Sequence, residues 1–330
     1  MIKIFSMFSG VGGFELGFQQ ANLQTQVVGF CEIDKYASQI LETKFKGIKN
    51  YGDATKINET KLPNFDILVG GFPCQAFSIA GKRLGFRETR GTLFFDIARI
   101  LSHKKPRHFI LENVRGLFSH DSGRTFQTIL GVLSDIGYMV QWELLNSKNF
   151  GVPQNRERIY LVGNLRGRGR GKVFPIGQIS KEDSKESKLK ELTENKSQAY
   201  RVYDQDGLAT TLKSVGGGIG AKTGLYKVKE ATKTGYAIAQ EGDSINLSVP
   251  SSKTRRGRVG RGVAQTLDTG MQQHTLQNSK IRRLTPIECE RLQGFPDGWT
   301  EGLSDTQRYK CLGNAVTTNV VSEVIRSIYL

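Results

Sequence analysis

The chain has 330 residues, which is long enough for one large hydrophobic core or for a large domain with a smaller one beside it. Its four cysteines stand far apart without a C-x-x-C spacing, and no apolar stretch approaches the ~18 residues of a membrane span. The composition therefore argues against a zinc site, a disulfide framework and a membrane protein. The chain starts directly with a strand-like segment and shows no signal-peptide pattern, so we expect a reduced, cytoplasmic protein.

The net charge of +16 is unevenly distributed. Residues 166–280 contain 21 Lys and Arg against 11 Asp and Glu, a net charge of +10, so the rest of the chain shares only +6. A basic surplus gathered in one segment favours DNA or RNA as a partner, although a soluble protein with one solvated basic face has the same composition.

Up to about residue 165, short apolar runs alternate with amphipathic stretches. The apolar runs predict strands at Ile2–Phe8, Gln26–Cys31, Phe65–Gly70, His108–Leu111, Val140–Leu145 and Ile159–Val162. The amphipathic stretches predict helices at Gly13–Gln20, Lys35–Lys44, Leu93–Leu101 and Thr125–Ile136. This alternation predicts an α/β fold with a doubly wound, mostly parallel sheet covered on both faces.

The alternation ends at the Arg-Gly repeat of residues 166–172. Residues 181–192 are charged and suit either a helix or a linker, and frequent glycines between 207 and 262 predict loops and small strands. Regular structure returns at Thr285, which with Pro286 and Glu288 has the pattern of a capping box, and the chain ends in a predicted helix, Asn319–Ile328. We predict a first domain at 1–165, a smaller, irregular β-rich domain at 166–284, and a segment at 285–330 that returns to the first domain.

A glycine-rich turn, Phe8–Gly13, follows the first predicted strand and opens a helix. Glycines let a ligand approach the backbone, and the first turn of a helix offers free N–H groups. Glu32 ends the second predicted strand, where a carboxylate can accept from ribose hydroxyls, and Asp53 could contact the base of the same ligand. The turn alone would also suit NAD or a purely structural role, but the three features together favour a nucleoside cofactor.

Cys74 lies at the end of the third predicted strand, in Phe72-Pro73-Cys74-Gln75. Ligands of open α/β sheets bind at the carboxyl ends of the strands, so this thiol is a candidate nucleophile. The competing interpretation is a small buried hydrophobic residue, which free cysteines often are. Reaction would also require the thiolate, a minor species at neutral pH for a thiol with an unshifted pKa of ~8.5.

Glu112 follows the apolar strand that starts at His108 and would reach the same edge of the sheet. A water-poor pocket raises the pKa of a carboxyl group, which suits it to donate a proton. Arg156 and Arg158 precede the last predicted strand of the first domain and lie on one side of it by the period of two. They could brace loops, or they could hold a phosphate or a carbonyl of a substrate.

These motifs resemble, in content and in order, those of the DNA cytosine-5 methyltransferases of the bacterial restriction-modification type, most like the HhaI group. The matching positions are Phe8–Gly13, Glu32, Asp53, Gly71–Gln75, Arg90–Asp96, Glu112–Val114, Gln154–Arg158, Arg283–Pro296 and Gly313–Val316. They cover residues 1–165 and 281–330 almost continuously, whereas residues 166–280 share only Thr-Leu passages with the family.

The resemblance implies the sheet of an S-adenosylmethionine-dependent methyltransferase, with S-adenosyl-L-methionine as cofactor, S-adenosyl-L-homocysteine as product and no metal. The implied cofactor-binding residues are Phe8, Ser9, Gly10, Gly12, Gly13, Glu32, Ile33, Asp53, Ala54, Pro73, Leu93, Asn314 and Ala315. Two positions depart from the family pattern. Ile33 stands where relatives often carry an aromatic residue that packs on adenine, and Thr317 stands where many carry proline.

The resemblance also implies the catalytic residues: Cys74, Glu112, Arg156 and Arg158. Cys74 would add to carbon 6 of a cytosine, Glu112 would bind N3 and the amino group, and Arg158, with Arg156, would hold the oxygen on carbon 2. Attack above the ring plane cannot occur inside stacked DNA, so the base must flip out of the helix. Residues 76–92 would be a mobile loop that closes over this base, although an ordinary surface loop has a similar composition.

We expect double-stranded DNA to be recognised mainly by residues 166–280, through phosphates and guanine edges. The implied DNA-binding residues are Ser78, Arg90, Gln154, Thr211, Arg255, Arg256, Arg258 and Thr266. Two passages, Thr211-Leu212 and Thr266-Leu267, match a recognition core that occurs once in the family. We prefer the second, which lies nearer the capped helix at Thr285.

We further expect a cytoplasmic monomer in a prokaryotic cell or a phage-infected host, in a restriction-modification or phage self-protection setting. Any cognate restriction endonuclease would act separately.

Three alternatives remain open at the level of sequence. The main one is an RNA cytosine-5 methyltransferase of the tRNA-modifying branch, which usually has a second proline in place of Phe72 and lacks a long glycine-rich recognition segment. A catalytically silent DNA-binding relative would have no need of an intact set of Cys74, Glu112 and two arginines. A nicotinamide dehydrogenase would explain only the glycine turn.

Overall fold

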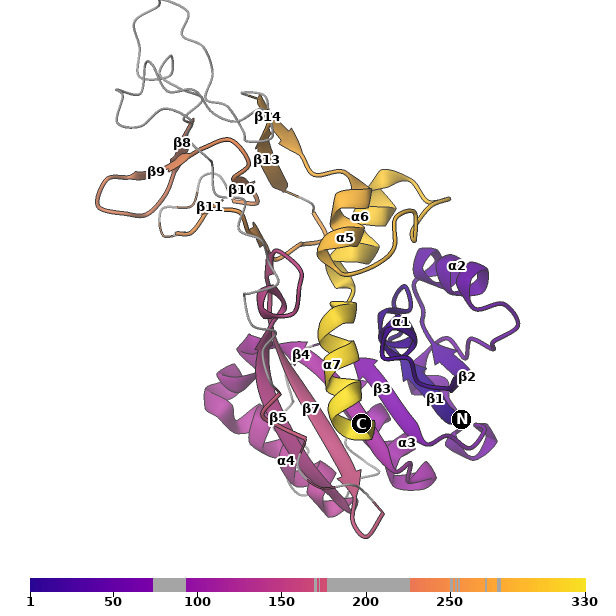
Figure 1. Ribbon diagram of the computed structural model, residues 1–330. Helices are drawn as coiled ribbons and strands as arrows, with labels where there is room; N and C mark the ends of the chain where they lie inside the picture. The colour runs from indigo at the N-terminus through magenta and orange to yellow at the C-terminus, as the bar shows by residue number, and fades with distance from the viewer. Residues whose placement is uncertain are drawn as a thin grey trace, which may run out of the picture.

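The computed structural model describes residues 1–73, 93–168, 171, 173–176, 226–249, 252, 254, 256–270, 272–277 and 280–330. Figure 1 shows a large lower part built on one sheet, a smaller upper part of short strands, and the C-terminal helices between and beside them. No helix within these residues is both long and apolar enough to cross a membrane.

A six-stranded sheet organises the large part, in the order β2-β1-β3-β4-β7-β5. Its strands are β1 (Ile2–Met7), β2 (Thr25–Cys31), β3 (Ile67–Gly71), β4 (His108–Val114), β5 (Tyr138–Asn146) and β7 (Glu157–Leu165). Strands β2, β1, β3 and β4 pair in parallel, and β7 runs antiparallel to both of its neighbours. The predicted α/β fold with a mostly parallel sheet is confirmed.

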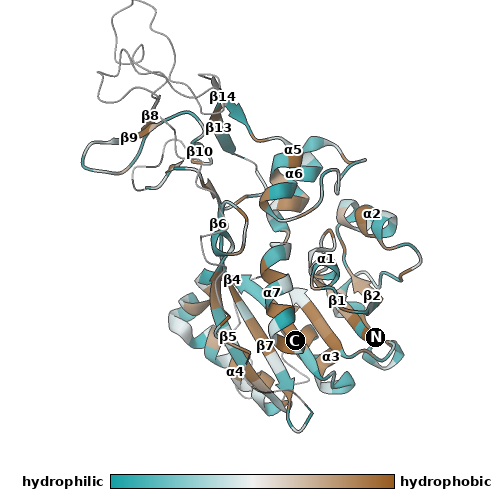
Figure 2. Cartoon of the chain, viewed as in Figure 1, coloured by the Kyte–Doolittle hydropathy of each residue, from teal (hydrophilic) through white to brown (hydrophobic). Residues whose placement is uncertain are grey.

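Two layers of helices cover this sheet because its central strands are apolar on both faces. Along β3, Leu68 packs on one side with α3 (Leu93–Lys104) and α4 (Arg124–Asp135). Ile67 and Val69 pack on the other side with α1 (Gly13–Gln20) and α7 (Thr318–Tyr329). Figure 2 shows hydrophobic residues concentrated along these strands, with polar residues on the outer sides of the helices.

The helix signals read from the sequence agree closely with the structure. Helices α1 and α2 (Lys35–Lys44) have the predicted bounds, and the Asp34 side chain caps α2. Thr285 and Glu288 form the predicted capping box at the start of α5 (Pro286–Leu292). Helix α6 (Asp305–Asn314) was not predicted, because most of its residues are polar and only a short run near its end is buried.

Short 3-10 helices occur in the connections of the large part. They are η1 (Ala54–Lys56), η2 (Glu59–Lys61), η4 (Arg115–Phe118), η5 (His120–Gly123) and η6 (Ser147–Asn149).

The smaller part is an antiparallel sheet in the order β11-β10-β13-β14, with a separate hairpin, β8–β9. Its strands are β8 (Tyr226–Lys229), β9 (Tyr236–Ala239), β10 (Ser244–Asn246), β11 (Val259–Gly260), β13 (Gln273–Gln277) and β14 (Lys280–Arg283). A small core of Val228, Ala239, Ile245 and Leu276 holds them together.

Two connections cross the predicted domain boundaries. Val173, Phe174 and Ile176 pack into the α1–α7 side of the large part, beyond the predicted boundary at residue 165. Strand β12 (Ala264–Gln265) pairs in parallel with β6 (Gln154–Asn155). The division at residues 166 and 284 remains a prediction, and the parts on either side of it are joined by this strand pair.

Candidate active site

The carboxyl edge of the sheet brings the predicted catalytic motifs together. Gly71 at the end of β3 pairs in register with Glu112 of β4, and Val114 pairs with Arg158 of β7. The Asn113 side-chain amide donates to the carbonyl of Phe72 over 2.8 Å, which fixes the chain two residues before Cys74. Cys74 itself, Ser78, Arg90 and the predicted loop at 76–92 lie outside the described residues.

Glu112 and Arg158 form a buried ion pair at this edge. The Nε atom of Arg158 lies 3.0 Å from Oε1 of Glu112, and the two side chains are 16% and 11% exposed. Burial raises the pKa of the Glu112 carboxyl, and the positive charges of Arg158 and Arg156 only partly oppose that rise. The site therefore provides a carboxyl group with an increased tendency to keep its proton, beside a fixed cation.

The end of β3 leaves room for this carboxyl only because residue 71 is glycine. A Cβ atom added at Gly71 would lie 3.1 Å from Oε2 of Glu112. Such a contact is tighter than carbon and oxygen ordinarily allow, so the carboxyl group would have to shift. The glycine thus helps to set the position of Glu112.

Arg156 has different surroundings from Arg158, although the sequence placed them together. Its guanidinium is 3% exposed and donates to the backbone carbonyls of Leu267, Gly313 and Ala315, at 3.4, 3.3 and 2.7 Å. Arg156 therefore braces the segments of Leu267 and of Gly313–Ala315, which is the structural alternative that the sequence left open. Its contact with a substrate stays a prediction.

Gln154, predicted to bind DNA, is completely buried. Its amide donates to the Leu292 carbonyl over 2.8 Å and its oxygen accepts from the Leu267 N–H over 3.0 Å. Gln293, also fully buried, donates to the Leu312 carbonyl over 2.8 Å. We refer to Gln154, Arg156 and Gln293 as the buried polar junction. The hydrogen bonds of Gln154 hold the protein together, and its contact with DNA stays a prediction.

The three other cysteines are poor candidates for a nucleophile. Cys31, Cys289 and Cys311 are buried free thiols. Burial raises the pKa of Cys31 and of Cys311 to about 12, and it raises the pKa of Cys289 as well. These groups stay protonated at neutral pH, and a thiol is a far weaker nucleophile than a thiolate.

The glycine turn after β1 is held by contacts from distant parts of the chain. Gly10 and Gly12 have φ angles of 54° and 85°, in the left-handed region that favours glycine. A Cβ atom at Gly12 would lie 2.6 Å from the Phe45 ring, and one at Gly13 would lie 2.7 Å from Val316. The indole N–H of Trp299 donates to the Val11 carbonyl over 2.8 Å. The turn therefore has a defined shape with glycines where side chains would not fit.

The predicted nucleoside-binding residues gather beside this turn. The Glu32 carboxylate accepts from the Gly10 N–H and the Asp34 N–H, each over 2.8 Å. The Cys31 thiol donates to the Gly52 carbonyl over 2.9 Å, which holds the segment carrying Asp53 close to the end of β2. Ile33 is 76% exposed, so it offers an apolar surface next to two carboxylates. This donor and acceptor set fits a nucleoside.

The other predicted cofactor residues differ in their exposure to solvent. Ser9 and Ala54 are buried, Ala315 is buried with its carbonyl bound by Arg156, and Phe8 has a left-handed φ of 54°. Pro73 and Asn314 are exposed. Leu93 is half-buried at the first residue of α3. Among the described residues, no cluster of His, Cys, Asp or Glu is arranged to hold a metal ion.

A polar pocket of about 340 Å³ lies next to the Glu112–Arg158 pair. It is lined by Val114, Arg115, Gly116, Asn155, Glu157, Arg158, Gln265 and Thr266. Thr266 donates to the Asn155 carbonyl over 2.9 Å, so the preferred Thr-Leu passage forms one wall of it. No sequence pattern indicated a role for four of these residues: Arg115, Asn155, Glu157 and Gln265. The position of Arg115 directly after Glu112-Asn113-Val114 was the available signal.

The remaining predicted DNA-binding residues divide between exposed, buried and undescribed positions. Arg256 lies on the surface, with its Nε donating to the Ala231 carbonyl over 2.8 Å. Arg258 is only 1% exposed and donates to the Val249 carbonyl, so it stabilises the smaller sheet, and its contact with DNA stays a prediction. Thr211 and Arg255 lie outside the described residues.

Comparison with known proteins identifies the family of the chain. Residues 2–330 match the family described as C-5 cytosine-specific DNA methylase. The chain is 40% identical to the Type II methyltransferase M1.ScrFI of Lactococcus lactis subsp. cremoris, over 98% of this chain and 76% of that protein. It is 39% identical to the Type II methyltransferase M.NlaX of Neisseria lactamica, over 98% and 95% of the two chains.

Solved structures of low sequence identity share the fold. The Dnmt2 methyltransferase of S. pombe aligns with a TM-score of 0.63 at 18% identity, covering 99% of this chain and 98% of that one. A prophage-encoded DNA modification methyltransferase, described as putative, from E. coli aligns with a TM-score of 0.63 at 19% identity, covering 100% and 99%. The chain belongs to the C-5 cytosine-specific DNA methylase family and is a DNA cytosine-5 methyltransferase.

Proposed function

We propose that this chain is a sequence-specific methyltransferase that uses Cys74 to activate a cytosine flipped out of duplex DNA. The observation that carries the proposal is the buried Glu112–Arg158 pair, in register with the end of the strand that leads to Cys74. A carboxyl group whose pKa is raised by burial, next to a fixed guanidinium, suits the N3 edge and the carbon 2 oxygen of a cytosine.

The cofactor site proposed is the glycine turn with the residues around Glu32 and Asp53. Phe8, Gly10 and Gly12 would face the methionine part of S-adenosyl-L-methionine, and Glu32 and Asp53 would accept from its ribose and adenine. When bound, the cofactor supplies an electrophilic methyl group on a sulfonium, which an activated carbon 5 of cytosine can take.

The protein's own residues carry the rest of the chemistry. The Cys74 thiolate forms a bond to carbon 6, and the displaced electron pair moves towards N3, which takes a proton from Glu112. Carbon 5 then becomes nucleophilic. After methylation, solvent water takes the carbon 5 proton as the Cys74–carbon 6 bond breaks and frees the thiolate, and the proton on N3 returns to the Glu112 carboxylate. Arg158 holds the carbon 2 oxygen, and Arg156 keeps the surrounding segments in place.

The extruded base must be presented by a bound duplex, for which residues 166–280 are the proposed recognition segment. Their positive charge suits the phosphate backbone, and Thr266 at the polar pocket supports the second Thr-Leu passage as the recognition core. We propose that the enzyme acts as a monomer in the cytoplasm of a prokaryotic cell or a phage-infected host. Both a restriction-modification setting and a phage self-protection setting suit it.

Bisulfite sequencing of plasmid DNA from cells that express the chain tests activity and target together. The expected result is protection of cytosines within one short sequence, and its loss with Cys74→Ser. Unchanged methylation by that variant would contradict the role of Cys74. A duplex with 5-fluorocytosine at the target position should form a covalent complex with the wild-type protein, and recovery of free protein alone on a denaturing gel would contradict the covalent step.

A parallel assay separates DNA from RNA as the substrate. Tritium from labelled S-adenosyl-L-methionine should appear in duplex DNA and remain absent from tRNA. Transfer to tRNA alone would favour the RNA alternative.

A further inference from the structure

The polar pocket beside the Glu112–Arg158 pair has walls from both functional parts of the chain. Arg158 and Glu157 come from the start of β7, and Arg115 starts η4 directly after β4. Gln265 and Thr266 come from the segment that pairs with β6. A duplex held by the recognition segment, with one base in the catalytic site, would have to pass this pocket.

Arg115 is the most exposed charged side chain among the residues that line the pocket. Its side chain is 67% exposed, and its Nη1 atom lies 2.6 Å from Oε2 of Glu157, which is 37% exposed. An ion pair this open to water is weak, because solvent screens the attraction and ordering two long side chains costs entropy. An anionic ligand that enters the pocket could therefore displace Glu157 from Arg115 at little cost.

The pocket's chemistry favours an anionic ligand with several oxygen atoms. Arg115 and Arg158 bring two guanidinium groups, and Asn155, Gln265 and Thr266 add neutral polar groups. A guanidinium group binds phosphate oxygens through two parallel N–H donors. It has more N–H donors than a single carboxylate partner can occupy. The main negative group of the pocket itself is Glu157, which is already paired.

The backbone holds Arg115 at a fixed distance from the catalytic pair. Val114, the residue before it, pairs in register with Arg158. The Asn113 side chain accepts from the Val114 N–H over 2.8 Å while it donates to Phe72. The start of η4 is thus tied to the same residues that position Glu112, so a group bound by Arg115 would lie beside the reacting base.

From this arrangement we propose that Arg115 binds a backbone phosphate of the DNA strand that carries the extruded cytosine. Glu157 is its resting partner and holds the guanidinium at the mouth of the pocket until the phosphate replaces it. The inference rests on the proposed function and adds one DNA contact to it.

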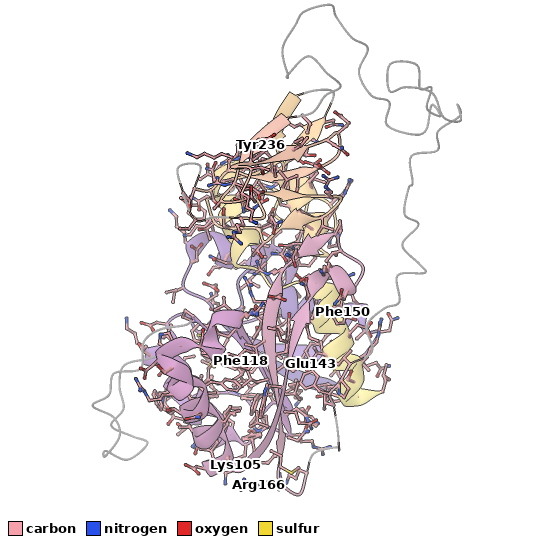
Figure 3. All side chains as sticks on the ribbon, turned by 90° about the vertical axis from the view of Figure 1, so that its left-hand side faces the viewer. Lys105, Phe118, Glu143, Phe150, Arg166 and Tyr236 are labelled. Carbon is pink, nitrogen blue, oxygen red and sulfur yellow. The ribbon has the colours of Figure 1, made fainter. Side chains whose placement is uncertain are left out.

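Arg107 provides a matched control for Arg115. Both arginines are exposed and flank β4, Arg107 directly before its first residue and Arg115 directly after its last. Arg107 therefore lies at the opposite edge of the sheet. Lys105, two residues earlier, is at the far end of the molecule from Tyr236 of the smaller part (Figure 3).

The test measures how tightly the protein binds a DNA duplex that contains its target sequence, at several salt concentrations. For B-DNA, log Kobs falls against log salt with a slope of about −0.9 per phosphate contact. Arg115→Gln should make this slope shallower by about 0.9 and raise KM for DNA, with little change in kcat at saturating DNA. Arg115→Lys should restore the slope, and Arg107→Gln should leave it as in the wild type. Glu157→Gln, which removes the competing carboxylate, should bind DNA at least as tightly as the wild type.

Three results would overturn the assignment. They are an Arg115→Gln slope equal to that of the wild type, an equal loss with Arg107→Gln, or a Glu157→Gln variant that binds as weakly as Arg115→Gln. The third would mean that the pair only supports the fold. A wild-type chain that transfers no methyl group to duplex DNA would instead overturn the proposed function.

Discussion

The Arg158 guanidinium lies against the Glu112 carboxyl at 3.0 Å, and both side chains are more than four-fifths buried. A guanidinium cation and a carboxyl group are therefore fixed side by side at the edge of the sheet. Burial favours a proton on Glu112, whereas Arg158 favours its loss. Because these two effects oppose each other, we expect the protonation state of Glu112 to shift when a cytosine, whose N3 can accept a proton, enters the site.

We expect Glu112→Gln to lower the rate of methyl transfer by about 100-fold or more, in the range typical of a lost general acid. Glutamine keeps the shape of the side chain and offers its amide NH2 as a hydrogen-bond donor, but it cannot transfer a proton to N3. Single-turnover transfer with saturating DNA and cofactor measures the effect. S-adenosyl-L-homocysteine binding should be unchanged, as a control for folding. A rate within threefold of the wild type would remove Glu112 from the proton path.

Gly71→Ala should reduce kcat while leaving cofactor affinity intact. The added Cβ would lie 3.1 Å from Oε2 of Glu112, so the carboxyl must move away from its position beside Arg158. Misplacing a catalytic group by a fraction of an ångström is costly for the rate. The control is Gly131→Ala, since a Cβ there, in the exposed part of α4, meets no atom within 4 Å. Equal kcat values for the two variants would count against this role of Gly71.

Trp299→Phe should weaken cofactor binding by about 3- to 10-fold, the usual range for one net hydrogen bond. The substitution removes the donor to the Val11 carbonyl and keeps an aromatic ring against Phe295. The chain has one other tryptophan, Trp142, which is 44% exposed on β5. Titration of S-adenosyl-L-homocysteine by calorimetry should show normal affinity for Trp142→Phe. The same affinity for both variants would show that the Trp299 contact does not support the turn.

Glu15 should make folding stability depend on pH. It is 1% exposed on α1, both carboxyl oxygens lack a hydrogen-bond partner among the described residues, and burial raises its pKa to about 7. The pKa of Glu15 is higher in the folded state than the value of 4.5 expected in the unfolded chain, so protonated Glu15 stabilises the folded state. This stabilisation is present in full below pH 4.5 and is lost as pH rises through about 7.

The wild type should therefore lose roughly 2 to 3 kcal/mol of unfolding free energy, relative to Glu15→Gln, between about pH 5 and about pH 8. Urea unfolding at the two pH values measures the difference. Glu42→Gln, at an exposed position of α2, should show no such change against the wild type. A difference between wild type and Glu15→Gln that does not vary with pH would rule out titration of Glu15 in this range.

The sequence was sufficient to locate most of the sheet and its edge because the signals are local. Apolar runs mark strands buried on both faces, and the bounds of α1 and α2 follow from the glycine turn and from the Asp34 cap. The strand predictions then placed Cys74 and Glu112 at one edge, since parallel strands end together. The pairing of Gly71 with Glu112 in the structure agrees with that reasoning. Arg158 reaches the same edge because β7 runs antiparallel to β4.

Other contacts of the predicted site residues were missed because the partners are distant in sequence. Gln154 bonds to Leu292, 138 residues away, and Arg156 to Gly313, 157 residues away. No local pattern distinguishes such an arginine from one that binds a phosphate. The contact of Arg258 with the Val249 carbonyl was not predicted either, because no sequence signal joins two residues nine positions apart in an irregular segment.

The buried polar junction restricts where recognition segments can be exchanged between relatives. The N–H and the carbonyl of Leu267 are both partners of the junction, and a Cβ at Gly313 would lie 2.6 Å from the backbone of Asp268. If a recognition segment from a relative replaced this chain up to and beyond residue 267, its backbone would have to rebuild these contacts. If the incoming segment ended before Ala264, this chain's own residues would keep them. The incoming segment could then change in length and sequence specificity while the catalytic edge stays intact.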